Sequence, residues 1–128
     1  MRLKTTCFAV MTALIAAPTL AKTETRCGWY NNPTPGNVFL KDADGFWWIS
    51  QQGTPPAPGF DDAYTPAFDD RDRVVTNGSS YGYSCACANG DFGPVGSMQV
   101  RLIAQLKALP LAQCENDSNL PDSPYFGE

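Results

Sequence analysis

Residues 37–51 carry the clearest structural signal in the chain and read Asn-Val-Phe-Leu-Lys-Asp-Ala-Asp-Gly-Phe-Trp-Trp-Ile-Ser-Gln. Two runs of strand-forming residues flank Asp44-Gly45, a dipeptide typical of two-residue hairpin turns. We therefore predict a β-hairpin in which Leu40 faces Ile49. Because side chains alternate along a strand, one face then carries Val38, Leu40, Trp47 and Ile49, and the other carries Phe39, Lys41, Phe46 and Trp48.

Outward from this hairpin, two further regions favour strands. Residues 74–76 and 81–87 flank a turn signal at Asn77-Gly78, and we expect the face with positions 81, 83, 85 and 87 to form the core. Residues 98–107 alternate apolar and polar side chains as a strand does, although leucines at 102, 106 and 109 also fit a helix, so both readings stay open. The prediction is a mainly β fold, a small antiparallel domain arranged as a barrel or a sandwich.

The cysteines predict a disulfide framework. Beyond residue 21 the chain has Cys27, Cys85, Cys87 and Cys114, an even number that is typical of exported domains. A bridge between Cys85 and Cys87 would strain an extended segment. Cys27 should therefore pair with one of them and Cys114 with the other, in either of two arrangements. We predict no metal site, because the chain lacks the histidines that complete mixed zinc sites.

The N-terminal residues 1–21 read as a secretory signal peptide. Arg2 and Lys4 precede an apolar run from about residue 7 to residue 17, and Ala21 ends a segment suited to cleavage. We therefore expect export to the periplasm or beyond, with residues 22–128 forming a single small β-domain. No remaining run is long and apolar enough to span a membrane.

Two segments of this domain lack a regular pattern. Residues 53–72 combine prolines with aspartates, which predicts a long acidic surface loop. Residues from about 115 to 128 are polar and contain prolines, so we expect this C-terminal tail to fray.

Several separated motifs occur in an order that resembles the domain of unknown function 4087 family of small secreted bacterial proteins. They are Arg26-Cys27-Gly28-Trp29, the Asn-Pro-Thr-Pro-Gly run at 32–36, the Trp-bearing hairpin, the Gly-Tyr-Ser-Cys-Ala-Cys run at 82–87, and the Leu-Pro-Leu-x-x-Cys run at 109–114. The resemblance covers nearly all of residues 22–128. It implies a bacterial periplasmic setting and a framework role for the four cysteines, and it carries no activity or catalytic residue.

Composition favours a non-catalytic binding or inhibitory protein of the bacterial envelope. The chain has no histidine, so the usual pairs of nucleophile and base cannot be assembled, and we predict no cofactor. Its net charge of −4 disfavours nucleic acid as a partner. Its many aromatic side chains suit an envelope protein or a cell-wall glycan instead. The contact residues that we predict are Phe46, Trp48 and Tyr81.

Two other functions stay open at the level of sequence. Asp61 and Asp70 could act as the acid-base pair of a hydrolase if the fold brings them into one cleft. Cys85 and Cys87 could act as a thiol-disulfide redox pair, which requires that they exchange with each other as a dithiol.

Overall fold

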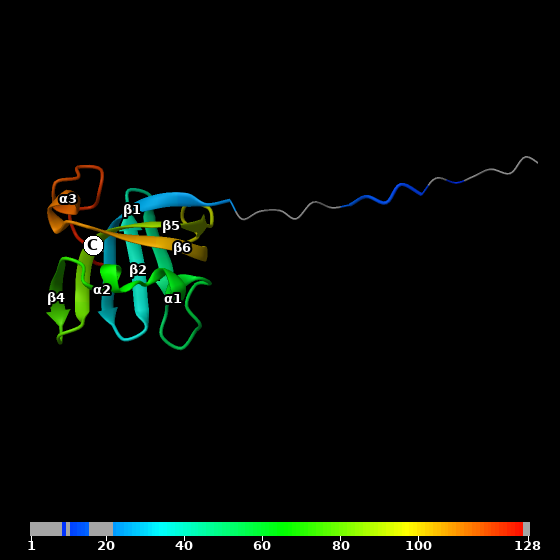
Figure 1. Ribbon diagram of the computed structural model, residues 1–128. Helices are drawn as coiled ribbons and strands as arrows, with labels where there is room; N and C mark the ends of the chain where they lie inside the picture. The colour runs from blue at the N-terminus through cyan, green and yellow to red at the C-terminus, as the bar shows by residue number, and fades with distance from the viewer. Residues whose placement is uncertain (1–8, 10, 16–21, 127–128) are drawn as a thin grey trace, which may run out of the picture.

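Antiparallel strands make up most of the computed structural model, which describes residue 9, residues 11–15 and residues 22–126. The described residues form six strands: β1 (Glu24–Thr34), β2 (Asn37–Asp42), β3 (Gly45–Ser50), β4 (Arg73–Asn77), β5 (Tyr81–Phe92) and β6 (Val100–Leu109). They make one sheet in the order β3-β2-β1-β5-β4, with β6 also paired to the long strand β5 (Figure 1). The mainly β antiparallel fold is confirmed. The predicted signal peptide lies mostly outside the described residues.

The sheet curls until two of its strands meet. Trp48 of β3 forms a parallel bridge with Gln99, just before β6, and its main-chain N–H donates to the oxygen of Met98 at 3.0 Å. Figure 1 shows β6 crossing in front of the strands β1 to β3. The inner face of the curled sheet, which carries Tyr30 and Trp47, thus encloses the main core.

The segment 53–72 covers this core, so the prediction of an irregular surface loop is wrong. It contains two short helices, α1 (Phe60–Ala63) and α2 (Pro66–Asp69). Phe68 is buried, and Phe60 and Tyr64 pack against the same core. These rings follow a helical spacing that the surrounding prolines and aspartates obscure. The aspartates themselves are all exposed.

The predicted hairpin is confirmed as β2 and β3, but its register differs by two residues. Leu40 pairs with Trp47 instead of Ile49. The reason is Asp42, whose side chain accepts two main-chain N–H bonds from the turn and so starts the turn earlier than predicted. A shift of two residues, unlike a shift of one, leaves every side chain on its predicted face.

On β5, the main core lies on the opposite face from the one predicted. Ala86 and Ala88 belong to the main core, whereas Tyr83 and Cys85 belong to a smaller cluster on the outer face. Small side chains suit the inner face because large rings from β1, β3 and α2 already fill it. The outer face of the sheet is therefore the one that carries Trp29, Asn31, Phe39, Lys41, Tyr83 and Cys85.

Strand β6 settles the open reading of residues 98–107 in favour of a strand. Its pairing with β5 is interrupted by two register shifts. A bulge changes which side chains face inward, so Val100, Ile103 and Leu106 all pack against the main core. Of the leucines that also fitted a helix, Leu106 packs against the main core and Leu109 against the outer-face cluster, so they do not form one stripe.

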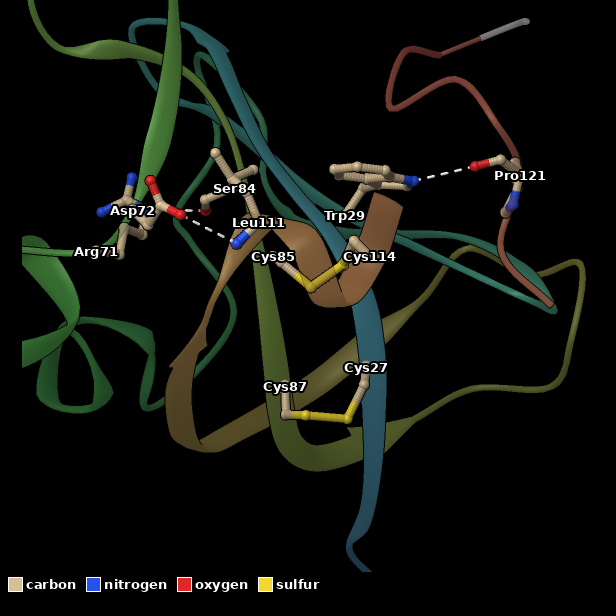
Figure 2. Close-up of a disulfide and its surroundings, with 10 residues drawn as sticks. All are labelled: Cys27, Trp29, Arg71, Asp72, Ser84, Cys85, Cys87, Leu111, Cys114 and Pro121. Carbon is tan, nitrogen blue, oxygen red and sulfur yellow. Dashed lines mark hydrogen bonds between the residues drawn. A yellow bond between two sulfur atoms is a disulfide. The ribbon is translucent and has the colours of Figure 1, made fainter. Parts of the chain in front are cut away.

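Both disulfides start from β5 (Figure 2). Cys87 is bonded to Cys27 on the neighbouring strand β1, and Cys85 is bonded to Cys114 in helix α3 (Leu111–Glu115). The predicted framework is confirmed, and one strand anchors both ends of the domain. Two disulfides indicate an oxidising compartment outside the cytoplasm. No helix among the described residues is long and apolar enough to cross a membrane.

Candidate functional site

The outer face of the sheet holds a cluster of four aromatic side chains, which we call the aromatic cluster: Phe39, Phe46, Trp48 and Phe126. The centre of the Phe39 ring lies 5.4 Å from the ring centres of both Phe46 and Trp48. The Phe126 ring lies 4.5 Å from Phe46 and 5.7 Å from Trp48. Phe126 is 53% exposed, and Phe46 and Trp48 are half-buried, so the cluster reaches solvent.

The structure brings two of the three predicted contact residues together. Phe46 and Trp48 are both members of the aromatic cluster. Tyr81 lies at the start of β5, which β1 and β2 separate from β3 in the sheet. The candidate site is therefore built around Phe46 and Trp48.

The C-terminal residues extend this site instead of fraying. Residues 121–126, which we call the strap, lie on the outer face because side chains of β1 and β2 hold their main-chain oxygens. Trp29 Nε1 donates to the oxygen of Pro121 at 3.0 Å (Figure 2), and Asn31 Nδ2 donates to the oxygen of Pro124 at 3.1 Å. Both donors belong to buried side chains, so the expectation of a frayed tail is wrong for these residues.

Lys41 binds two further main-chain oxygens of the strap. Its Nζ donates to Ser123 at 2.8 Å and to Tyr125 at 2.6 Å, and it lies 5.1 Å from the centre of the Phe46 ring. The residue is only 3% exposed. Burying an ammonium group without hydrogen-bond acceptors costs free energy. The two strap oxygens offset part of this cost for Lys41.

Aromatic contacts continue from the strap across the sheet. The Tyr125 ring lies 5.8 Å from that of Tyr83 on β5, which in turn lies 5.7 Å from that of Trp29. Tyr125 is 41% exposed. Tyr125 and Phe126 therefore add two partly exposed rings to the outer face.

A charged network locks the hairpin against β1. Arg26 Nη1 lies 3.0 Å from Asp42 Oδ2 and 2.8 Å from Asp44 Oδ2, and the guanidinium lies 4.1 Å from the centre of the Trp47 ring. Partial burial works against the charged form, but the bonds to both aspartates outweigh it and raise the pKa of Arg26. The network thus holds in place the hairpin that carries Phe46.

A buried arginine, Arg71, ties the α1–α2 segment to β5. Arg71 Nε donates to Ser84 Oγ at 3.1 Å, and its Nη1 donates to the Tyr64 hydroxyl at 2.9 Å. The guanidinium lies 5.0 Å from the centre of the Tyr30 ring. Burial raises the pKa of the Tyr30 phenol well above its usual range, and the nearby charge of Arg71 opposes this shift.

The structure does not place the residues of the hydrolase or of the redox alternative in the arrangement that each function needs. Asp61 lines a cavity of about 340 Å³, but Asp70 is not among the residues around that cavity, and both carboxylates are exposed. Cys85 and Cys87 belong to different disulfides and so do not form one exchanging pair. The part of the chain that the structure describes contains no group of three or more side chains suited to hold a metal ion.

A family model described as a protein of unknown function (DUF4087) matches residues 21–121. The chain belongs to this family. The DUF4087 match covers the whole sheet, both disulfides and the three residues that hold the strap, and it ends at Pro121. No curated protein and no solved structure matches the chain.

Each residue of the first DUF4087 motif, Arg26-Cys27-Gly28-Trp29, has a separate structural role in this chain. Arg26 forms the ion pairs with the hairpin, and Cys27 forms a disulfide. A side chain at Gly28 would collide with the main-chain oxygen of Lys41. Trp29 holds the strap through its indole N–H. The motif therefore joins the hairpin, β5 and the C-terminal residues.

Sequence reasoning missed the strap and the three donors that bind it. The sequence shows Trp29 only as part of the first motif, and it assigns no role to Asn31 or Lys41. A usable signal was present in the tail, because Pro121 and Pro124 have the Pro-x-x-Pro spacing of polyproline recognition segments and two aromatic residues follow them.

Proposed function

We propose that this DUF4087 protein is a non-catalytic binding protein of the bacterial periplasm or exterior that recognises its partner through the aromatic cluster. The observation that carries the proposal is that the cluster reaches solvent although the main core is complete without it. The main core comprises inner-face residues such as Tyr30, Leu40 and Trp47, and no member of the aromatic cluster belongs to it. Phe39 is buried, but the rings of Phe46, Trp48 and Phe126 reach solvent and are available for contact with a partner.

The chemistry around the cluster suits recognition of a macromolecule. Half-buried rings lose little freedom when they bind, and they anchor protein interfaces or stack on sugar rings. Met98, whose main-chain oxygen bonds to Trp48, is a further apolar residue exposed to solvent. The cluster therefore lies within a partly apolar region and not on a uniformly polar surface.

The compartment narrows the choice of partner. Disulfides persist outside the cytoplasm, and the predicted signal peptide would deliver the chain there. The partners we expect are an envelope protein or a cell-wall glycan.

A capture experiment tests the proposal. Oxidised protein, exported with its own N-terminal segment, is immobilised and offered bacterial envelope extract or purified cell-wall fragments. We expect the wild type to retain one partner, and we expect Trp48→Ala and Phe46→Ala to weaken retention at least about tenfold. Retention in only one of the two samples distinguishes a protein partner from a glycan.

The matched control is Val75→Ala, which changes an exposed apolar residue on β4, outside the aromatic cluster. Tyr81→Ala is measured separately because that residue lies away from the cluster. Folding of each variant is checked by near-ultraviolet circular dichroism. Full retention by folded Trp48→Ala and Phe46→Ala variants, or no retained partner in either sample, would contradict the proposal.

A further inference from the structure

The outer face beside the aromatic cluster offers hydrogen-bond donors to a main chain. Trp29, Asn31 and Lys41 make four hydrogen bonds to the strap, and every acceptor is a main-chain oxygen. An indole N–H and an ammonium group can only donate, and Asn31 uses its amide N–H here. We call the surface formed by these three residues and by Phe39, Phe46 and Trp48, over which the strap lies, the groove. Such a groove fits a peptide that presents many acceptors and few donors.

The strap has this chemistry. It reads Pro-Asp-Ser-Pro-Tyr-Phe over residues 121–126. Proline has a main-chain oxygen but no N–H, so two prolines enrich a segment in acceptors relative to donors. The Pro-x-x-Pro spacing is typical of segments that dock on aromatic grooves. The strap bends at Asp122 and Tyr125, and the fixed φ of each proline reduces the entropy that such a segment loses on binding. The final ring, Phe126, then packs in the aromatic cluster.

The strap is also attached in a way that permits exchange. Among the described residues, no main-chain to main-chain hydrogen bond joins residues 121–126 to a strand. Residues 115–119, which connect helix α3 to the strap, are all exposed. A segment without such bonds, at the end of an exposed linker, belongs to the least stable part of a fold.

From these observations we propose that the groove is a recognition site for a Pro-x-x-Pro-aromatic segment of a partner protein, and that the strap occupies it in competition. This inference rests on the proposed function and names the class of partner. The strap shows the contacts that a partner segment makes: two prolines whose oxygens meet Trp29 and Asn31, and a ring in the aromatic cluster. The DUF4087 match covers the donors of the groove and ends at Pro121, so most of the strap lies beyond the matched region.

The attached strap should weaken the binding of a free peptide by a measurable factor. A short linker holds its segment at an effective concentration of roughly millimolar, so a free peptide binds the wild type weakly. Weakening the strap should remove this competition and strengthen peptide binding by about tenfold or more, because apparent affinity scales with the fraction of open grooves.

The probe is a synthetic peptide with the sequence of residues 119–126, acetylated and amidated at its ends. It is titrated into the full exported protein and into a Pro124→Ala/Phe126→Ala variant of it, with Asp122→Ala as a matched strap control. Binding is followed by calorimetry and by the NMR signal of the Trp29 indole N–H. The comparison peptide has alanine at both proline positions.

We expect the strap variant to bind the peptide at least about tenfold more tightly than either the wild type or Asp122→Ala, with a shift of the Trp29 indole signal. The alanine peptide should bind at least about tenfold more weakly, and adding Lys41→Met to the strap variant should weaken binding similarly. Equal binding of the two peptides, equal affinity of the wild type and the strap variant, or an unchanged indole signal would overturn the proposal.

Two further outcomes are informative. A dimer of the wild type that grows with concentration and is dispersed by the peptide would identify the strap of a second copy as the occupant, and it would overturn the assignment to a different protein. An envelope partner captured through Trp48 without any peptide binding would overturn the groove and leave the proposed function standing. Peptide binding without any captured partner would support the groove and contradict the proposed function.

Discussion

Trp29 donates its indole N–H to the main-chain oxygen of Pro121 at 3.0 Å, and the two residues lie 92 positions apart in the chain. This bond joins the first motif of the DUF4087 match to its last residue. The two disulfides connect the same regions through β5. Its cysteines are bonded to Cys27 near the start of β1 and to Cys114 in helix α3. The outer face is therefore assembled from both ends of the described domain.

Trp29→Phe should loosen the strap without unfolding the sheet. The variant keeps an aromatic ring against Tyr83 but loses the donor to Pro121, which we expect to lower the free energy of unfolding by about 1 kcal/mol. Hydrogen exchange measured by mass spectrometry should become faster in residues 119–126 and stay unchanged in β5. Tyr83→Phe, which retains its ring, is the control. Unchanged exchange in the strap would show that other contacts hold it.

The Cys85–Cys114 disulfide should contribute more to stability than Cys27–Cys87, although it closes the shorter loop. For sequence separations of 60 and 29 residues, loop entropy predicts about 4 kcal/mol for Cys27–Cys87 and about 3.5 kcal/mol for Cys85–Cys114. Cys85 and Cys114 are buried, however, whereas Cys27 is exposed. Replacing the buried pair by alanine also leaves a cavity, which adds to the loss.

We therefore expect Cys85→Ala/Cys114→Ala to destabilise the protein more than Cys27→Ala/Cys87→Ala. Urea unfolding of both double variants, followed by tryptophan fluorescence, measures the difference. A larger loss for the Cys27–Cys87 pair would mean that loop entropy dominates over burial.

Gly28→Ala should be strongly destabilising, because the added methyl group would collide with the main-chain oxygen of Lys41. That oxygen belongs to the paired strand β2 and cannot move without disturbing the ladder, so we expect a loss of about 2 to 3 kcal/mol. Thermal unfolding provides the measurement. Ala104→Ser, at an exposed position of β6, is the control and should change little. A Gly28→Ala variant of normal stability would show that β1 and β2 can separate at this point.

Export should remove the N-terminal segment. If residues 1–21 are a signal peptide, intact-mass spectrometry of protein recovered from a bacterial periplasm should find a chain that begins at Lys22. Its mass should also be lower by four hydrogens than that of the reduced chain, since both disulfides are formed. A full-length mass would contradict the predicted cleavage.

The parts of the fold that follow from alternation and cysteine count could be predicted from sequence. Side chains of β2 and β3 lie on their predicted faces because a strand has a period of two. The register of the hairpin could not be predicted, because it depends on how the Asp42 side chain bonds to the turn. The core face of β5 was predicted wrongly because it depends on the volume contributed by other strands, which a local pattern does not contain.

The candidate site was predictable only in part for a similar reason. Aromatic residues of one hairpin, such as Phe46 and Trp48, can be recognised locally. The strap depends on contacts between Asn31 and Pro124 and between Lys41 and Tyr125, which lie at opposite ends of the chain. The composition of a polar, proline-bearing tail does not show that the tail binds to the outer face of the sheet.

Stability should fall at alkaline pH because of Tyr30. Burial raises the pKa of its phenol above the ordinary value of 10.0, with the charge of Arg71 opposing the shift. Above pH 10, the unfolded chain releases this proton while the folded chain keeps it, so the unfolded state binds fewer protons. The free energy of unfolding therefore decreases as pH rises, by at most about 1.4 kcal/mol per pH unit from this group. Below pH 9 the phenol is protonated in both states, so the contribution of Tyr30 does not change with pH. Tyr30→Phe keeps the ring and removes the titrating group. Urea midpoints measured between pH 9 and pH 11.5 should therefore fall less steeply in this variant than in the wild type. The control is Tyr125→Phe, which alters a partly exposed phenol and should behave as the wild type does. Identical slopes in all three proteins would show that the Tyr30 hydroxyl reaches solvent before the fold is lost.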